Sequence, residues 1–198
     1  MKYFLVLLVL LPTGLRAAGE PAEQGVAIFA GGCFWCTEAD FDKIPGVLST
    51  TSGYIGGRLE RPSYEQVSRG GTGHLEAVKV VFDPDVTDYS RLLDAFWPTV
   101  DPLDAGGQFC DRGYHYRSAI FYLDDNQRKL AQASRDALQS SAILAGEIVT
   151  LILPAGSFWP AEEYHQDYAR RNPLRYSYYR SRCGRDQRLE QVWKAEAR

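Results

Sequence analysis

The sequence has 198 residues, of which 45% are hydrophobic and 24% are charged, and its formal net charge is −3 at pH 7. A chain of this length can bury a full hydrophobic core as one domain, so its fold need not depend on disulfides or on a metal ion. Because proteins that bind nucleic acid usually present a basic surface, the acidic balance argues against a nucleic-acid partner.

The first 19 residues have the pattern of an export signal. A positive charge at Lys2 precedes eight consecutive apolar residues, 4–11, and small residues follow near position 18. The apolar segment is too short to span a membrane, and no later segment approaches the roughly 20 apolar residues that a spanning helix needs. We therefore expect a signal peptide over 1–19 and a single domain over 20–198. The mature protein is expected to be exported, with the periplasm as its compartment, and to be a monomer without stable membrane association.

Hydrophobic periodicity and turn residues predict a mixture of strands and helices. In chain order they are a strand over 26–30, a helix over 33–43, strands over 47–53 and 74–82, a helix over 88–97, a strand over 116–123, a helix over 125–141 and a strand over 147–153. The first six give the order β-α-β-β-α-β, which is typical of a ferredoxin-like α/β plait. The sequence therefore predicts an α+β fold of this kind, with long insertions and an irregular C-terminal tail from residue 154.

Two cysteines mark the turn between the first strand and the first helix. Cys33 follows the strand directly and opens the helix, where unpaired N–H groups and the helix dipole favour an anion. This position predicts a nucleophilic thiolate, with a pKa lowered from about 8.5 to roughly 3.5–7.5. Cys36 lies three residues further on the same helical face, within reach of an oxidised Cys33, so the spacing indicates redox turnover.

Other interpretations of the C-x-x-C motif remain open at this point. A structural zinc site is disfavoured, because the other two cysteines, Cys110 and Cys183, have no partner at ligand spacing. A structural disulfide between neighbours would close almost no loop and stabilise little. A periplasmic thiol-disulfide oxidoreductase is the main rival, although Phe34 and Trp35 indicate an apolar pocket rather than a flat exchange surface. The non-enzymatic alternative is a secreted binding module that uses the tryptophans.

The strand over 74–82 carries an acid in an apolar stripe. Alternation places Glu76 on the same face as Val78, Val80 and Phe82. A carboxyl held there has a raised pKa and suits a general acid, because burial disfavours its charged form. The alternative is a strand end at which Glu76 simply reaches water.

A glycine-rich loop over 106–118 brings Asp111, His115 and Tyr116 close together in the sequence. Loops on rigid scaffolds often carry function, although ordinary solvated charges would give the same pattern. Tyr64, taken alone, is more typical of a packing aromatic than of a catalytic hydroxyl.

These segments together resemble the A-type peptide methionine sulfoxide reductases. Six motifs carry the resemblance in the family's order, namely Gly-Gly-Cys-Phe-Trp at 31–35, Gly-Tyr-Ile-Gly-Gly at 53–57, Tyr-Glu-Gln-Val at 64–67, Gly-His-Leu-Glu-Ala-Val at 73–78, Tyr-Arg-Ser-Ala-Ile at 116–120 and Trp-Pro-Ala-Glu-Glu-Tyr-His at 159–165. The family's core is similar to the plait order above. Many relatives have glycine at the position of Cys36, asparagine at that of Cys110 and glutamine at that of His115.

The resemblance implies a role for each matching residue. They are Cys33 as nucleophile, Phe34 and Trp35 as the aromatics that hold the sulfoxide's methyl group, Glu76 as the acid, Tyr64 and Tyr116 as the phenols that bind the sulfoxide oxygen, and Asp111 as the loop aspartate. It also implies the S epimer of methionine sulfoxide as substrate, on oxidised proteins or as the free amino acid.

The expected chemistry uses only thiols and protein acids. Cys33 attacks the sulfoxide sulfur while Glu76 protonates the oxygen, and methionine leaves a sulfenic acid on Cys33. We expect Cys36 to form the first disulfide, Cys183 to accept it in a second exchange, and a thioredoxin-like dithiol to restore the enzyme. No metal ion or organic cofactor is required.

Overall fold

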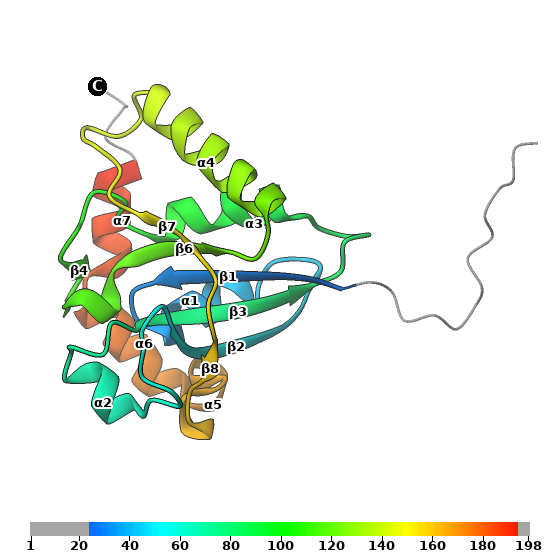
Figure 1. The fold of residues 1–198 in the computed structure, drawn as a ribbon. Coiled ribbons are helices and arrows are strands. Elements are labelled where there is room, and N and C mark those ends of the chain that lie inside the picture. Colours follow the sequence, from blue (N-terminus) through cyan, green and yellow to red (C-terminus); the bar gives the residue numbers. More distant parts are fainter. Residues whose placement is uncertain (1–23, 194–198) are drawn as a thin grey trace, which may run out of the picture.

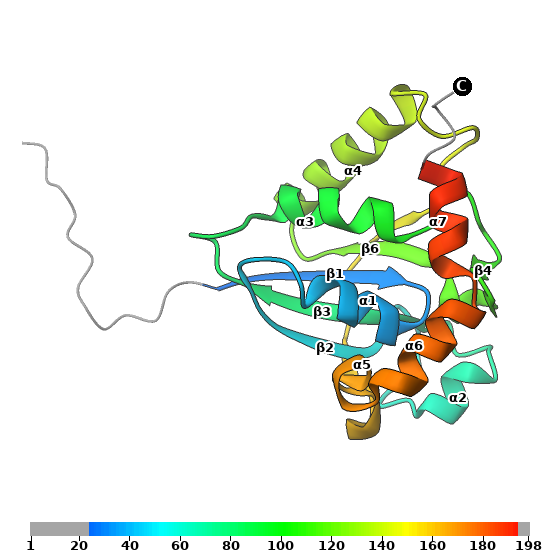
Figure 2. The same ribbon diagram turned by 180° about the vertical axis from the view of Figure 1, so that it is seen from behind.

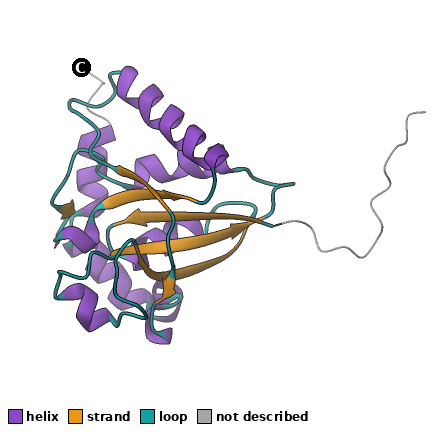
Figure 3. Cartoon of the chain, in the orientation of Figure 1, coloured by secondary structure: helices purple, strands orange, loops and turns teal. Residues whose placement is uncertain are grey.

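The computed structural model describes residues 24–193, which form a mixed sheet with helices gathered mainly on one side (Figure 1, Figure 3). The strands are β1 (Gly25–Gly31), β2 (Val47–Ile55), β3 (Leu75–Phe82), β4 (Gly107–Gln108), β5 (Asp111–Arg112), β6 (Ser118–Tyr122), β7 (Leu151–Pro154) and β8 (Trp159–Pro160). The α-helices are α1 (Phe34–Phe41), α2 (Tyr64–Ser68), α3 (Tyr89–Phe96), α4 (Asp125–Ser140), α5 (Tyr168–Arg171), α6 (Pro173–Arg182) and α7 (Arg185–Trp193). Single 3-10 turns lie at 97–99, 114–116 and 163–165.

Six strands form the main sheet in the order β7-β6-β1-β3-β2-β8, and β4 pairs with β5 in a separate hairpin. All neighbours in the main sheet are antiparallel except β6 and β7, which are parallel. The fold is therefore α+β, as the sequence predicts. Among the residues described, no helix is long and apolar enough to cross a membrane.

The two faces of the sheet are covered differently. Helices α1, α3, α6 and α7 lie over one face (Figure 2), and the chain leading from β7 to β8 crosses the other (Figure 1). The larger hydrophobic core lies on the helical side and includes Phe29, Phe41 and Phe96. A smaller core on the opposite side includes Ile55 and Phe121, with Phe158 packed against it.

Strand β3 shows how the sequence determines the two faces. Val78, Val80 and Phe82 belong to the core on the helical side, whereas Leu75 and Ala77 belong to the smaller core. This alternation is the one predicted from the sequence. It directs Glu76 towards the helical side, where α1 begins.

The predicted strands and helices up to residue 141 are present, with their ends shifted by a few residues, and the last predicted strand begins at Leu151 rather than at 147. The prediction of an irregular tail is wrong, because α5, α6 and α7 occupy most of it. The short helix α2 was also missed, although Ser63 and Gln66 form a capping box at its start. The predicted signal peptide over 1–19 lies outside the described residues.

Hydrophobic periodicity did not predict the tail helices, because these helices do not pack through a regular apolar face. Helix α6 has no buried residue. It is tied to α1 by Arg180, whose guanidinium contacts both carboxylate oxygens of Asp40 at 3.1 Å and also pairs with Asp186. Such contacts between distant residues leave no 3.6-residue hydrophobic period in the sequence.

Candidate active site

The candidate nucleophile lies at the turn from β1 to α1. Gly32 has a φ of +87°, and an added Cβ there would lie 2.6 Å from Gln108, so this turn requires glycine. Cys33 is the N-cap residue of α1, and its carbonyl accepts the N–H groups of Cys36 and Thr37. The predicted placement at a strand-to-helix turn is confirmed. The Cys33 side chain is buried, with 6% of the residue exposed.

Glu76 lies beside the same helix start. Its Oε2 accepts the backbone N–H of Phe34 at 3.0 Å, and only 2% of the residue is exposed. Burial raises the pKa of Glu76 to about 8, although the Phe34 N–H acts in the opposite direction. The predicted burial and raised pKa are therefore confirmed, and the alternative of a glutamate that reaches water is wrong. At neutral pH this carboxyl holds a proton beside Cys33.

The two thiols of the C-x-x-C motif interact, and their acidities differ from the prediction. Burial raises the pKa of Cys33 well above its usual range, and the neighbouring Cys36 and Glu76 raise it further. The prediction of a lowered Cys33 pKa is therefore wrong, because loss of solvation outweighs the helix start. The hydrogen bond with Cys33 lowers the pKa of Cys36 to about 7, against the effect of burial and with help from Arg185 and Arg180. As the pH rises, Cys36 therefore loses its proton before Cys33 does.

A small cavity of about 70 Å³ is lined by most of the predicted site residues. Its walls are Cys33, Phe34, Trp35, Tyr64, Glu76, Asp111, Tyr116 and Tyr179. These residues come from the start of α1, α2, β3, β5, the 3-10 turn at 114–116 and α6, so the fold assembles them from segments far apart in the sequence. Tyr179 was not predicted, because nothing in the sequence distinguishes it from the other tyrosines of the tail. Cys36 and Cys183 do not line the cavity.

Two phenols face the buried acid across this cavity. Burial raises the pKa of Tyr64 and of Tyr116, and the nearby Glu76 raises both further. Both phenols therefore keep their protons and can donate hydrogen bonds to an oxygen that gains negative charge. Glu162 holds Tyr64 in place by accepting its backbone N–H at 2.8 Å.

The indole of Trp35 is fixed by aromatic and polar contacts. Its Nε1–H donates to Nδ1 of His165 at 3.0 Å, and its ring stacks on Tyr168 with the centroids 3.7 Å apart. His165 is itself buried, and burial lowers its pKa, so the ring is neutral and can accept this hydrogen bond. Trp35 and the buried ring of Phe34 thus form a rigid apolar wall.

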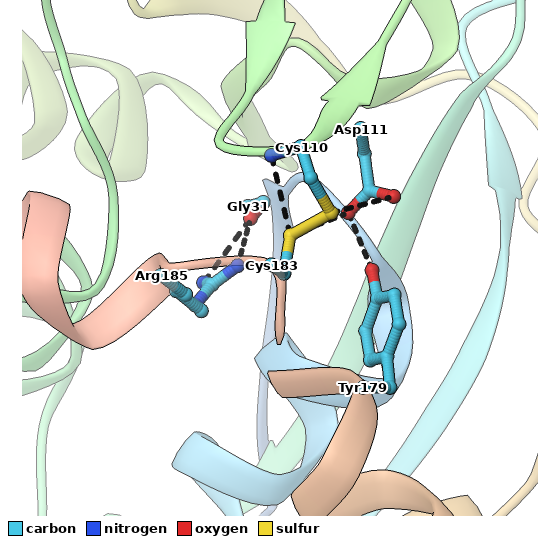
Figure 4. Close-up of a disulfide and its surroundings, with 6 residues drawn as sticks. All are labelled: Gly31, Cys110, Asp111, Tyr179, Cys183 and Arg185. Carbon is cyan, nitrogen blue, oxygen red and sulfur yellow. Dashed lines mark hydrogen bonds between the residues drawn. A yellow bond between two sulfur atoms is a disulfide. The ribbon is translucent and has the colours of Figure 1, made fainter. Parts of the chain in front are cut away.

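On the other side of the cavity, Asp111 is linked to α6. Tyr179 donates its phenolic O–H to Oδ2 of Asp111 (Figure 4). The same tyrosine interacts with Cys33. Burial raises the pKa of Asp111, whereas the hydrogen bond from Tyr179 and the charge of Arg185 act to lower it. Asp111 therefore accepts a hydrogen bond from a group that also reaches the nucleophile.

The remaining two cysteines form a disulfide, Cys110–Cys183 (Figure 4). Cys183 is the C-cap of α6 and not a thiol on a flexible tail, whereas Cys33 and Cys36 are free. Within residues 24–193, the one group of three potential metal ligands is Cys110, Asp111 and Cys183. While the disulfide is formed, its sulfurs carry no thiolate charge for a metal ion.

Comparisons with known proteins agree with this geometry. A family model described as "Peptide methionine sulfoxide reductase" matches residues 25–197. The chain is 54% identical over 171 residues to peptide methionine sulfoxide reductase MsrA of Bacillus licheniformis, covering 86% of this chain and 94% of the relative. It is 49% identical over 193 residues to MsrA 2 of Caulobacter vibrioides, covering 94% and 97%.

The fold also matches solved structures of methionine sulfoxide reductases. The reduced form of Mxr1 from Saccharomyces cerevisiae matches with a TM-score of 0.72 and 31% identity, covering 78% of this chain and 88% of that one. Methionine sulfoxide reductase A of Corynebacterium diphtheriae matches with a TM-score of 0.68 and 33% identity, covering 79% and 78%.

Proposed function

Because this chain belongs to the peptide methionine sulfoxide reductase family, we propose that it reduces the S epimer of methionine sulfoxide, in oxidised proteins and as the free amino acid, through a sulfenic acid on Cys33. The observation that carries the proposal is the cavity in which Cys33, the buried acid Glu76 and two phenols face one another. An apolar wall of Phe34 and Trp35 completes it, matching a substrate with a methyl group on one side and a polar oxygen on the other.

The reductive step follows from the protonation states around the cavity. The Cys33 proton passes to the Cys36 thiolate, and the resulting Cys33 thiolate attacks the sulfoxide sulfur. Glu76 delivers its proton to the oxygen while Tyr64 and Tyr116 donate hydrogen bonds to it. The oxygen then passes to the Cys33 sulfur as the substrate's sulfur–oxygen bond and the new sulfur–sulfur bond break, so methionine leaves and Cys33 is a sulfenic acid.

Resolution needs a second thiol, and we assign it to Cys36. Its S–H condenses with the sulfenic acid, so that a Cys33–Cys36 disulfide forms and water leaves. Over one turnover the protons of Cys33 and Glu76 end in that water, and the net charge of the site is unchanged. Cys183, the other predicted resolving residue, is already bonded to Cys110 and can enter an exchange only after that bond opens.

An external dithiol must then reduce the new disulfide. A thioredoxin-like protein is the proposed reductant, because its two thiols carry both electrons and leave as a disulfide. We also propose that the mature chain is exported and repairs oxidised exported proteins. The signal pattern over 1–19 supports this proposal.

We also propose that the core is a ferredoxin-like α/β plait. In support, the strands of the predicted β-α-β-β-α-β unit lie in the order β6-β1-β3-β2, and each is antiparallel to its neighbours.

The two epimers of methionine sulfoxide provide the direct test. The reduced protein is incubated separately with the S and the R epimer, and methionine and free thiols are counted. We expect one methionine formed and two thiols lost for each protein molecule with the S epimer, and neither change with the R epimer. Absence of methionine, together with rapid reduction of insulin disulfides, would instead support a thiol-disulfide oxidoreductase.

A further inference from the structure

The Cys110–Cys183 disulfide joins two segments that are 73 residues apart (Figure 4). Cys110 lies at the tip of the β4–β5 hairpin, and Cys183 caps the C-terminal end of α6. The Cys110 N–H also donates to the Cys183 sulfur at 3.2 Å. The bond therefore fixes the hairpin tip to the end of this helix.

Each cysteine is next to a group that lines the catalytic cavity. Asp111 directly follows Cys110, and Tyr179 lies one helical turn before Cys183. Their side chains are hydrogen-bonded to each other, and the Asp111 carboxylate oxygens lie 3.8 and 3.9 Å from the two sulfurs. The disulfide and the Tyr179–Asp111 hydrogen bond are thus two parallel links between the same segments.

Neither segment is anchored by a large buried apolar face. The hairpin pairs only two residues on each side, and α6 has no buried residue. Helices in proteins are stabilised mainly by tertiary packing, which for α6 is limited to part-buried side chains such as Tyr179. Just beyond the disulfide, the buried Arg185 donates to the Gly31 and Thr99 carbonyls and lies over the Phe109 ring. Arg185 thus links this end of α6 to the β1–α1 turn.

We propose that the Cys110–Cys183 disulfide is a clamp that holds Asp111 and Tyr179 beside Cys33 and stays formed throughout the catalytic cycle. This inference rests on the proposed function, because it concerns the rate of methionine formation. An external dithiol that reduces the clamp becomes a disulfide itself and leaves two thiols, at Cys110 and Cys183. The hairpin and α6 are then free to separate, and the methionine-forming step becomes slower.

The pH dependence of the methionine-forming rate distinguishes a displaced Asp111 from a general loss of structure. Burial is the main cause of the raised Glu76 pKa, and the negative charge of Asp111 raises it further. The other titratable groups around Glu76 are Cys33 and Cys36 at the start of α1 and the phenols Tyr54, Tyr64 and Tyr116. If Asp111 moves away, the Glu76 pKa falls, so the alkaline limb of the rate profile moves to lower pH.

The wild-type protein in two redox forms gives the test. Limited dithiol prepares a form with two thiols, at Cys33 and Cys36, and excess dithiol prepares a form with four. After removal of the dithiol, one equivalent of methionine-S-sulfoxide is added and the first turnover is followed. We expect the four-thiol form to be on the order of ten- to a hundred-fold slower, the cost of misplaced groups at a reacting centre, with its alkaline limb at lower pH.

The double variant Cys110→Ser/Cys183→Ser should behave like the four-thiol form, whereas Ser181→Ala, an exposed change at the same end of α6, should behave like wild type. Equal first-turnover rates and pH profiles in the two redox forms would overturn the clamp. Loss of dithiol-dependent recycling in the double variant, with a normal first turnover, would instead make this disulfide a redox relay. Methionine formation by the two-thiol form tests the proposed function separately.

A different observation supports a second inference, about the substrate chain. A groove of about 600 Å³ adjoins the catalytic cavity and shares two of its walls, Trp35 and Tyr64. Its other lining residues are Tyr164, His165, Tyr168, Arg171, Asn172 and Arg175. The cavity of about 70 Å³ has room only for the reacting group, so the rest of a polypeptide substrate must lie outside it.

The groove is basic in a chain whose net charge is negative. Arg171 is engaged by Glu163 at 3.0 Å, whereas Arg175 is exposed and has no ion pair or side-chain hydrogen bond to any residue within 24–193. We infer that the groove binds the polypeptide next to the methionine sulfoxide and favours a carboxylate side chain there. This inference also rests on the proposed function.

Reciprocal charge changes test the groove. Two peptides carry methionine-S-sulfoxide flanked by aspartate or by lysine, and kcat/KM is measured for wild type, Arg175→Glu and the control Lys129→Glu. Lys129 lies on α4, at the opposite end of the molecule from α5 (Figure 1). We expect wild type and control to favour the aspartate peptide by roughly two- to five-fold, the worth of an exposed ion pair. Arg175→Glu should reverse the preference between the two peptides. Equal kcat/KM values for both peptides in wild type, or an unchanged preference in Arg175→Glu, would contradict the inference.

Discussion

Replacing Glu76 by glutamine removes the proposed acid while keeping the shape of the side chain. The amide oxygen of glutamine can still accept the Phe34 N–H, so the start of α1 is expected to stay in place. With a pKa of about 8, roughly nine-tenths of wild-type molecules hold the Glu76 proton at pH 7. Glu76→Gln has no proton of this acidity to deliver, so we expect the methionine-forming step to slow by on the order of 10²–10⁴.

The same substitution has a defined effect on stability. The folded-state pKa of Glu76 is raised above its unfolded value, so its favourable contribution is complete below about pH 4.5 and is lost as pH rises through about 8. Because each tenfold change in proton affinity corresponds to about 1.4 kcal/mol, the total loss is roughly 5 kcal/mol for this buried carboxyl. The uncharged glutamine has no such cost, so Glu76→Gln should be less sensitive to pH between 5 and 9 than wild type.

Two assays check these expectations. Stopped-flow or quenched-flow measurement of methionine formed in the first turnover, between pH 5 and 10, reports the acid step without the later reduction of the disulfide. Denaturant unfolding over the same range reports the stability. A first turnover at the wild-type rate in Glu76→Gln, or a wild-type rate that does not fall above pH 8, would refute the assignment of Glu76 as the acid.

Further predictions concern the thiols and the N-terminus. Cys33→Ser should fold normally by circular dichroism but form no methionine, and a tenth of wild-type activity would contradict the nucleophile assignment. Cys36→Ser should complete the first turnover and then stop at a sulfenic acid, which a dimedone label detects by mass; continued turnover at the wild-type rate would exclude Cys36 as the resolving thiol. Expressed with its first 19 residues, the protein should be exported and begin near residue 19 or 20 on N-terminal sequencing, and a cytoplasmic product that still begins at Met1 would argue against the signal peptide.

Sequence patterns predicted the parts of the fold whose geometry depends on a few neighbouring residues. The alternation along β3 placed Glu76 with Val78 and Val80, and the structure shows that arrangement. The strand-to-helix turn at Cys33 follows from Gly32 and the apolar strand before it. In these cases two or three neighbouring residues decide the geometry, so the sequence was sufficient.

Properties that depend on distant contacts were not predictable in this way. The pKa of Cys33 depends on burial under residues from several elements, so the helix start alone gave the wrong direction. Tyr179 reaches the cavity from a helix without an apolar face, and the pairing of Cys110 with Cys183 depends on where that helix ends. The roles of Tyr64 and Tyr116 came from the family resemblance and not from their local pattern.

The central claim is that one sulfoxide is reduced by Cys33 and that Cys36 resolves the product. Peptide mapping by mass spectrometry after a single turnover of the two-thiol form with methionine-S-sulfoxide tests it most directly. The account predicts one methionine per protein molecule, a new Cys33–Cys36 bridge and an intact Cys110–Cys183 bridge. A Cys33–Cys183 bridge with Cys36 still a free thiol would contradict it.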